Sequence, residues 1–236
     1  AFKTYFDGFK AAGEGTPPIN EHDNLNYLYR PGVKMRLQIV AAGAGALLSP
    51  VLMRPGSSSF LDMIHLPYDY TQISEFYKGS LTEYPEPQAG ETMCSANSTR
   101  RLMDGLLLRD PQLSNVYRMN IAINAALTTN RFRKGINRFY VCVSRPGIAG
   151  TDKPGTQWSW TYEFKLTKLD ERFHTTFFNE AGILGHRMKE EQVVTEVALS
   201  LAHQGTFEID RIKRLFPCIL GIEDHGLFKH TLKGKG

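Results

Sequence analysis

The sequence has few cysteines and no long hydrophobic run. Its three cysteines, Cys94, Cys142 and Cys218, lie far apart and include no CxxC pair. This scarcity argues against a disulfide framework and a zinc site, and it favours a reducing compartment. His225 and His230 lie close together but lack a zinc-type carboxylate pattern, so we expect no metal ion and no cofactor. No apolar stretch approaches the roughly 20 residues that cross a bilayer, so we also expect no transmembrane segment.

The length and composition fit one substantial domain with extensions, because 236 residues, 42% of them hydrophobic, can fill a sizeable core. We predict an N-terminal aromatic arm at residues 1–33, an α/β domain at residues 34–205 and a C-terminal basic extension at residues 206–236. The arm contains more aromatic residues than disordered leaders normally do. We therefore expect it to pack on its own domain or on a partner.

The charge of the chain is mildly basic, with a net charge of +4 and a pI near 8.9. This balance slightly favours an anionic partner such as RNA or an acidic subunit, although ordinary enzymes carry as much. Basic residues gather in two places, which form either a solvated rim or contacts with an anion or RNA. They are Arg131, Arg133, Lys134 and Arg138 in the domain, and Lys229, Lys233 and Lys235 in the tail.

Apolar periodicity predicts the elements of the domain. Alternating or continuous apolar residues indicate strands, whereas apolar residues spaced by three and four indicate helices. We predict strands at 35–40, 60–70, 139–144, 157–166 and 172–178, and helices at 47–52, 95–109, 114–128, 185–203 and 207–216. We assign Ser98 as the N-cap of the helix at 95–109. These elements predict an α/β fold, a three-layer α/β/α sandwich in which helices cover both faces of a mixed sheet.

Residues 35–60 are the stretch around which we expect the domain to be organised. A short buried strand leads into the small residues from Ala41 to Ala46, and a helix follows. Such a turn between strand and helix is where α/β proteins bind anions or carry nucleophiles. Gly43 and Gly45 could begin a dinucleotide fingerprint, although Leu48 stands where its third glycine belongs. The alternative is that the small residues serve only tight packing.

Four segments in order carry a resemblance to a known family. They are LLSPVLMRPGSSSF at 47–60, GIAG at 147–150, KPGTQW at 153–158 and the helix that begins at Gly185, and Tyr68 falls where a family tyrosine would. Together they resemble the CinA C-terminal domain, also known as the nicotinamide-nucleotide amidohydrolases. The match spans about residues 35–204. It implies the CinA C-terminal version of the α/β sandwich.

The resemblance also implies where a catalytic site would lie. The family hydrolyses the nicotinamide amide of NMN with a serine nucleophile, a lysine base and a nearby tyrosine. The motifs assign Ala42 to the serine position, or a neighbour on either side if the register slips, and Ile73 to the lysine position. Tyr68 and Gly147 complete the assigned site. Because hydroxyl attack on an amide needs both a nucleophile and a base, we expect no catalysis.

These observations lead to two functional hypotheses. The first is a pseudoenzyme, a non-catalytic structural subunit of a larger assembly such as the mitochondrial ribosome or a respiratory complex. Its arm and tail would then dock on other protein subunits, and RNA is a further candidate partner. A mitochondrial location, otherwise a cytoplasmic one, follows from this pattern and from an Ala1 start without an initiator methionine. The alternative is an NMN amidohydrolase or NMN-binding sensor that retains the family pocket.

Overall fold

The structure is a computed structural model that describes residues 36–77, 93–109, 118–146, 156–171, 174, 180–204 and 209–231. The predicted arm at residues 1–33 lies outside the described residues, as do residues 147–155 and 232–236. Of the predicted strand at residues 172–178, only His174 is described. No helix within the described part of the chain is long and apolar enough to cross a membrane.

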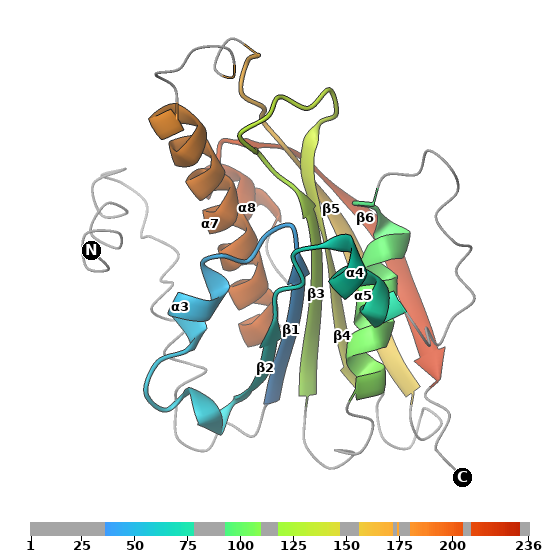
Figure 1. Ribbon diagram of the computed structural model, residues 1–236. Coiled ribbons are helices and arrows are strands. Elements are labelled where there is room, and N and C mark those ends of the chain that lie inside the picture. The colour runs from blue at the N-terminus through green and yellow to red at the C-terminus, as the bar shows by residue number, and fades with distance from the viewer. Residues whose placement is uncertain are drawn as a thin grey trace.

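A six-stranded mixed sheet forms the centre of the molecule (Figure 1). Its strands lie in the order β2-β1-β3-β4-β5-β6, with β1 parallel to both β2 and β3 and the remaining neighbours antiparallel. The strands are β1 (Arg36–Ala42), β2 (Leu61–His65), β3 (Arg118–Ala126), β4 (Asn137–Pro146), β5 (Thr156–Leu166) and β6 (Ile219–Thr231).

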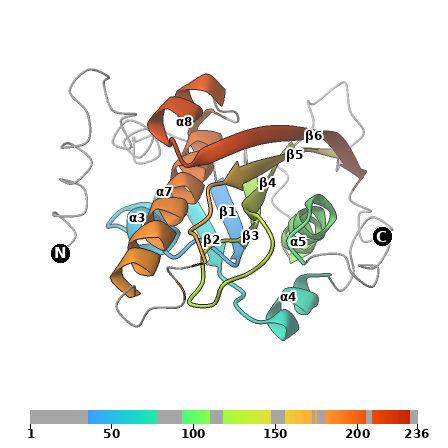
Figure 2. The ribbon, with the colours of Figure 1, turned by 90° about the horizontal axis from the view of Figure 1, so that it is seen from above.

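Helices cover both faces of this sheet, as the view from above shows (Figure 2). The helices are α3 (Leu48–Leu52), α4 (Tyr70–Tyr77), α5 (Ala96–Arg109), α7 (Glu180–Gln204) and α8 (Ile209–Leu215), and a short 3-10 helix, η1 (Ser57–Ser59), precedes β2. Buried residues of α3, α7 and α8 share one apolar core with the sheet, and those of α4 and α5 share another. The predicted three-layer sandwich with a mixed sheet is thereby confirmed.

The two faces of the sheet differ in polarity. On the α7 face, apolar side chains such as Ile39, Ile121 and Val141 pack against Val194 and Val197 of the helix. On the α5 face, polar residues are buried among the apolar ones. They are Gln38, Asn120, Ser144, Ser159 and Thr161 from the strands, and Ser98, Thr99 and Asp104 from α5. Because buried polar groups need partners, this second face is held by hydrogen bonds as well as by apolar contact.

The structure corrects the prediction of a helix at residues 114–128. Residues 118–126 form β3, a central strand between β1 and β4. Met119, Ile121 and Ile123 pack on the α7 face, whereas Ala122 belongs to the α5 core. The prediction was wrong because Met119, Ile123 and Leu127 lie four residues apart, a spacing that fits one face of a strand as well as one face of a helix.

Smaller differences concern the helix starts and the C-terminal part. The N-cap of α5 is Ser95, whose Oγ accepts a hydrogen bond from the Ser98 N–H at 3.1 Å, so the assignment of Ser98 was wrong. Helix α4 lies almost wholly in a stretch for which no element was predicted. Within the segment predicted as a C-terminal extension, the expected short helix is present as α8. There, β6 adds an unpredicted strand to the same sheet.

Candidate functional site

The turn between β1 and α3 is shaped by glycines. Gly43 follows Ala42, the last residue of β1, and has a φ of +73°, which favours glycine. A Cβ atom on Gly43 would lie 2.2 Å from the backbone oxygen of Ala125, so the turn lies directly against the end of β3. The small residues therefore serve close packing of the turn against the sheet.

The backbone donors of this turn are occupied by a carboxylate of the chain itself. Glu191 on α7 is 1% exposed, and its Oε2 accepts hydrogen bonds from the Gly45 N–H at 2.8 Å and the Ala46 N–H at 3.1 Å. Arg187 pairs with the other Glu191 oxygen at 2.7 Å and also donates to the Gly43 carbonyl at 2.9 Å. An external anion would have to displace this internal ion pair.

The preceding residue of α7, Glu190, fixes the connection from β3 to β4. Its Oε2 accepts a hydrogen bond from the Thr128 N–H at 2.7 Å, and its Oε1 accepts one from Asn137 Nδ2 at 2.7 Å. His186 Nε2 lies 3.7 Å from Oε1. Burial raises the pKa of Glu190, and these hydrogen bonds and His186 oppose that shift. Two adjacent carboxylates of one helix thus hold two different loops.

The structure brings together two of the four residues that the motifs assign to the site. Ala42 is 1% exposed and belongs with Ile73 of α4 to one buried apolar cluster. Tyr68 is 92% exposed, and its backbone N–H donates to Gln72. Gly147 lies outside the described residues. The positions assigned to the nucleophile and the base therefore hold hydrocarbon side chains within the same core.

A row of polar side chains begins beside Ala42 and crosses the sheet on the α5 face. Ala42 pairs with Asn124, Asn124 with Tyr140, Tyr140 with Glu163, and Glu163 with Glu223. Residues paired in this way lie side by side on one face. Motif assignment did not find this row. The signal for it was the alternation of polar residues with apolar ones along β4 and β5.

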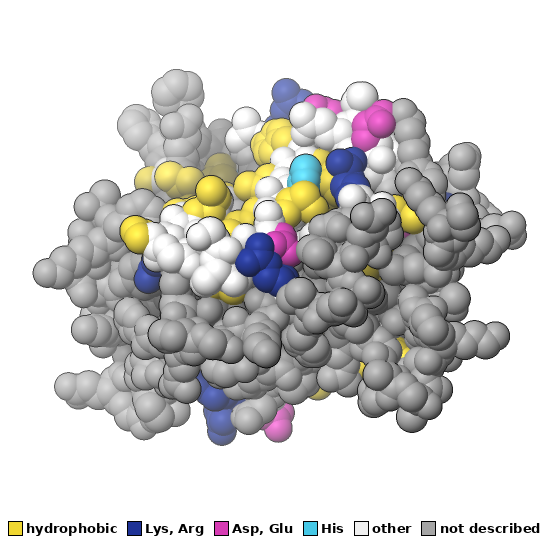
Figure 3. Space-filling model, turned by 90° about the horizontal axis from the view of Figure 1, so that it is seen from below, with side chains coloured by type: hydrophobic (Ala, Val, Ile, Leu, Met, Phe, Trp, Pro, Cys, Tyr) yellow, Lys and Arg dark blue, Asp and Glu magenta, His cyan; other side chains and the backbone are white. Residues whose placement is uncertain are grey.

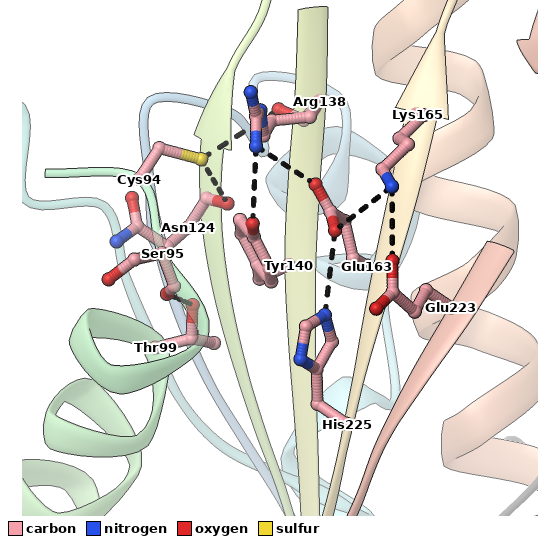
Figure 4. Close-up of polar contacts among 10 residues, drawn as sticks. All are labelled: Cys94, Ser95, Thr99, Asn124, Arg138, Tyr140, Glu163, Lys165, Glu223 and His225. Carbon is pink, nitrogen blue, oxygen red and sulfur yellow. Dashed lines mark hydrogen bonds and ion pairs between the residues drawn. The ribbon is translucent and has the colours of Figure 1, made fainter. Parts of the chain in front are cut away.

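Charged groups meet at the far end of this row (Figure 4). The buried Glu163 carboxylate, 3% exposed, is paired through Oε1 with Arg138 at 3.1 Å and through Oε2 with Lys165 at 3.7 Å. Lys165 also binds Glu223 at 3.0 Å, and His225 Nε2 lies 3.5 Å from Glu163 Oε2. We call Glu163, Glu223 and His225, together with Arg138 and Lys165, the β5–β6 cluster. It is the place on the α5 face where side chains could hold a cation.

Two neighbours of the β5–β6 cluster are poorly suited to act as ionised nucleophiles or bases. Burial raises the pKa of the Cys94 thiol to about 12 and that of the Tyr140 hydroxyl to about 12. Cys94 Sγ donates to the Asn124 carbonyl at 3.3 Å. A thiol with this pKa is almost wholly protonated at neutral pH, and the thiolate is the reactive form. Cys94 is therefore poorly suited to act as an activated nucleophile.

The predicted basic residues of the domain divide into internal and exposed ones. Arg133 donates to the Ala126 carbonyl at 2.7 Å, and Arg138 pairs with Glu163 as described above. Arg131 and Lys134 are exposed and remain available to an anion or RNA. In the tail, the Lys229 side chain, Lys233 and Lys235 lie outside what the structure describes.

The fold defines the class of the chain as a three-layer α/β sandwich protein. Its strand–turn–helix corner lies at Ala42, between β1 and α3. No protein-family model matches the sequence, and no curated protein matches it. The chain is similar in fold to solved CinA-superfamily proteins, the group that its motifs resemble.

Three of these structures show the extent of the similarity. The CinA superfamily protein of Klebsiella pneumoniae gives a TM-score of 0.41 at 11% identity, over 78% of this chain and 98% of that one. The competence/damage inducible protein CihA of Agrobacterium tumefaciens gives 0.37 at 12%, over 80% and 99%. The CinA superfamily protein of Enterobacter cloacae gives 0.38 at 12%, over 77% and 96%.

Proposed function

We propose that this chain is a non-catalytic interaction subunit of a larger assembly. A mitochondrial setting, with the mitochondrial ribosome or a respiratory complex as the assembly, is part of the proposal. The observation that carries it is the hydrogen bonding of Glu191 to the N–H groups of Gly45 and Ala46. These donors are the ones that a substrate anion would need at this corner. The hydrocarbon side chains of Ala42 and Ile73 support the same conclusion.

Exposed apolar side chains near the edge of the sheet also support an interaction role. Met53, Leu66, Tyr68 and Tyr70 lie in sequence around β2, which occupies one end of the sheet, and all four are exposed. The molecule seen from below shows hydrophobic side chains gathered over part of one face (Figure 3). Exposed apolar side chains that gather on one face are typical of surfaces that contact other proteins.

Native co-purification tests the proposed role. The tagged chain should migrate with a large assembly in a gently lysed mitochondrial extract, and crosslinking should identify the neighbouring subunits. The double variant Leu66→Ser with Tyr68→Ser should leave the assembly while it keeps its unfolding temperature. The control Ile136→Ser, at another exposed apolar side chain, should stay bound. A chain that migrates alone in such extracts would contradict the proposal.

The second candidate is an NMN-binding sensor or NMN amidohydrolase, and the polar row from Asn124 to Glu163 beside Ala42 is the observation that favours it. Calorimetry with NMN and an assay of ammonia release distinguish the two candidates. We expect neither binding nor turnover. Binding without ammonia release would favour the sensor, and ammonia release would establish the enzyme and overturn the proposal above.

A further inference from the structure

We propose that Glu163, Glu223 and His225 form a binding site for a divalent transition-metal ion of the Zn²⁺ type. One ligand atom from each residue lies within 4.8 Å of the other two. Carboxylate oxygens and imidazole nitrogens are both ligands of zinc, and three protein ligands leave a fourth position for water. This inference does not depend on the proposed function, because it concerns different side chains from those at the β1–α3 corner.

The contact between His225 and Glu163 brings two potential metal ligands together. His225 Nε2 lies 3.5 Å from Glu163 Oε2, and this nitrogen is buried without a hydrogen-bond partner. When the imidazole is neutral with its lone pair on Nε2, two electron pairs face each other. A proton on Nε2 or a metal ion between the two atoms relieves this repulsion. Metal–ligand bonds of zinc place two tetrahedral ligands about 3.4 Å apart, which agrees with the observed separation.

The backbone holds these ligands on two paired strands. Glu163 of β5 is directly opposite Glu223 of β6. His225 comes two residues after Glu223, so both side chains leave the same face of β6. The ladder is irregular where Trp160 and Tyr162 of β5 pair with β6, and Gly226 has a φ of +86° at this point. A bulge of this kind redirects neighbouring side chains, and here His225 lies beside Glu163.

The two cations of the β5–β6 cluster have different roles in this site. Arg138 binds Glu163 Oε1 at 3.1 Å and leaves Oε2 directed towards His225, so it positions a ligand. Lys165 lies 3.0 Å from Glu223 and 3.7 Å from Glu163, where its ammonium takes the place of the metal charge. Its side chain is 39% exposed. It can therefore move into solvent when a divalent ion binds.

Metal titration of the full chain tests the site. The chain is first treated with EDTA and dialysed, and then titrated with ZnCl₂ by calorimetry and with CoCl₂ by visible absorption. We expect one equivalent to bind, with a cobalt spectrum of tetrahedral type and a rise in unfolding temperature on zinc addition. Failure of the wild-type chain to bind either ion saturably would overturn the proposal.

Variants identify the ligands. Glu163→Gln and His225→Gln should each weaken zinc binding by about tenfold or more, since loss of a supporting residue alone costs 10–100-fold. Lys165→Met should tighten binding, because the competing ammonium is gone. The matched control Glu171→Gln, at an exposed carboxylate away from the cluster, should bind as the wild type does. Unchanged affinity in both ligand variants, or weaker binding in Lys165→Met, would place the metal elsewhere and contradict the assignment. Circular dichroism confirms that each variant is folded.

Discussion

The Glu191 carboxylate of α7 accepts a hydrogen bond from the backbone N–H of Gly45 at 2.8 Å, across 146 residues of sequence. This contact joins the longest described helix to the turn between β1 and α3. The carboxylate of the chain itself occupies the backbone N–H groups of that turn that could otherwise bind an anion. The contribution of this contact to the free energy of unfolding can be measured directly.

Replacing Glu191 by alanine should destabilise the fold by about 2–4 kcal/mol, because it leaves two backbone donors and the Arg187 guanidinium without their buried partner. Urea unfolding followed by circular dichroism gives the change. The control Lys189→Ala removes an exposed charge from the same helix and should change stability by less than about 0.5 kcal/mol. Equal effects from both variants would show that the Glu191 contacts contribute little.

Gly43→Ala should destabilise the chain by about 2 kcal/mol or more, since the new Cβ overlaps the Ala125 carbonyl and the backbone has positive φ. Gly135→Ala is the matched control, because nothing lies within 4 Å of a Cβ at that position. Thermal unfolding of both variants is the measurement. A Gly43→Ala chain as stable as the control would mean that the corner opens more easily than the packing indicates.

Restoring the assigned nucleophile should not restore catalysis. Ala42→Ser adds a hydroxyl at a position that is buried beside hydrocarbon, and Ile73 leaves it without a base. We expect no ammonia from NMN above the wild-type background, either for Ala42→Ser or for Ala42→Ser combined with Ile73→Lys. Turnover by the single variant would mean that another described group acts as the base.

The stability of the chain should depend on pH through Glu190. Burial raises its pKa above the ordinary 4.5, so the folded chain binds this proton more tightly than the unfolded chain does. The stabilisation of the fold that comes from protonated Glu190 is therefore complete below pH 4.5. It is lost as the pH rises through the folded-state pKa of Glu190. Urea unfolding between about pH 4 and pH 8 should show a steeper decline, or a weaker rise, for the wild type than for Glu190→Gln. Parallel curves would contradict the raised pKa.

Much of the fold could be predicted from the sequence because its apolar patterns are strong. The strand at Ile39, the small-residue turn and the stripe of α7 through Val193 and Val197 follow directly from spacing. Strand β3 was mistaken for a helix because Met119, Ile123 and Leu127 recur every four residues, a spacing that fits one face of either element. The missed signal was the alternation of Met119, Ile121 and Ile123 with smaller or polar residues. Strand β6 was missed because Glu223, Asp224 and His225 place charged and polar groups within it.

The candidate site could be predicted only where a local motif describes it. The motif assigned Ala42 and Ile73 to the site, and both belong to one buried apolar cluster. The contact between Glu191 and Gly45 depends on how a distant helix packs. The meeting of Glu163 with Glu223 depends on the register of β5 against β6. Neither relationship leaves a signal in the spacing of residues along the chain.

Strand β6 comes last in the described chain but pairs with β5 along most of its length. During synthesis, a ribosome releases the first five strands before this sixth one emerges. Until then β5 presents unpaired backbone groups, which are a template for wrong association between nascent chains. The molecule therefore completes its sheet only after β6 has been synthesised, and a chaperone that shields β5 would act in that interval.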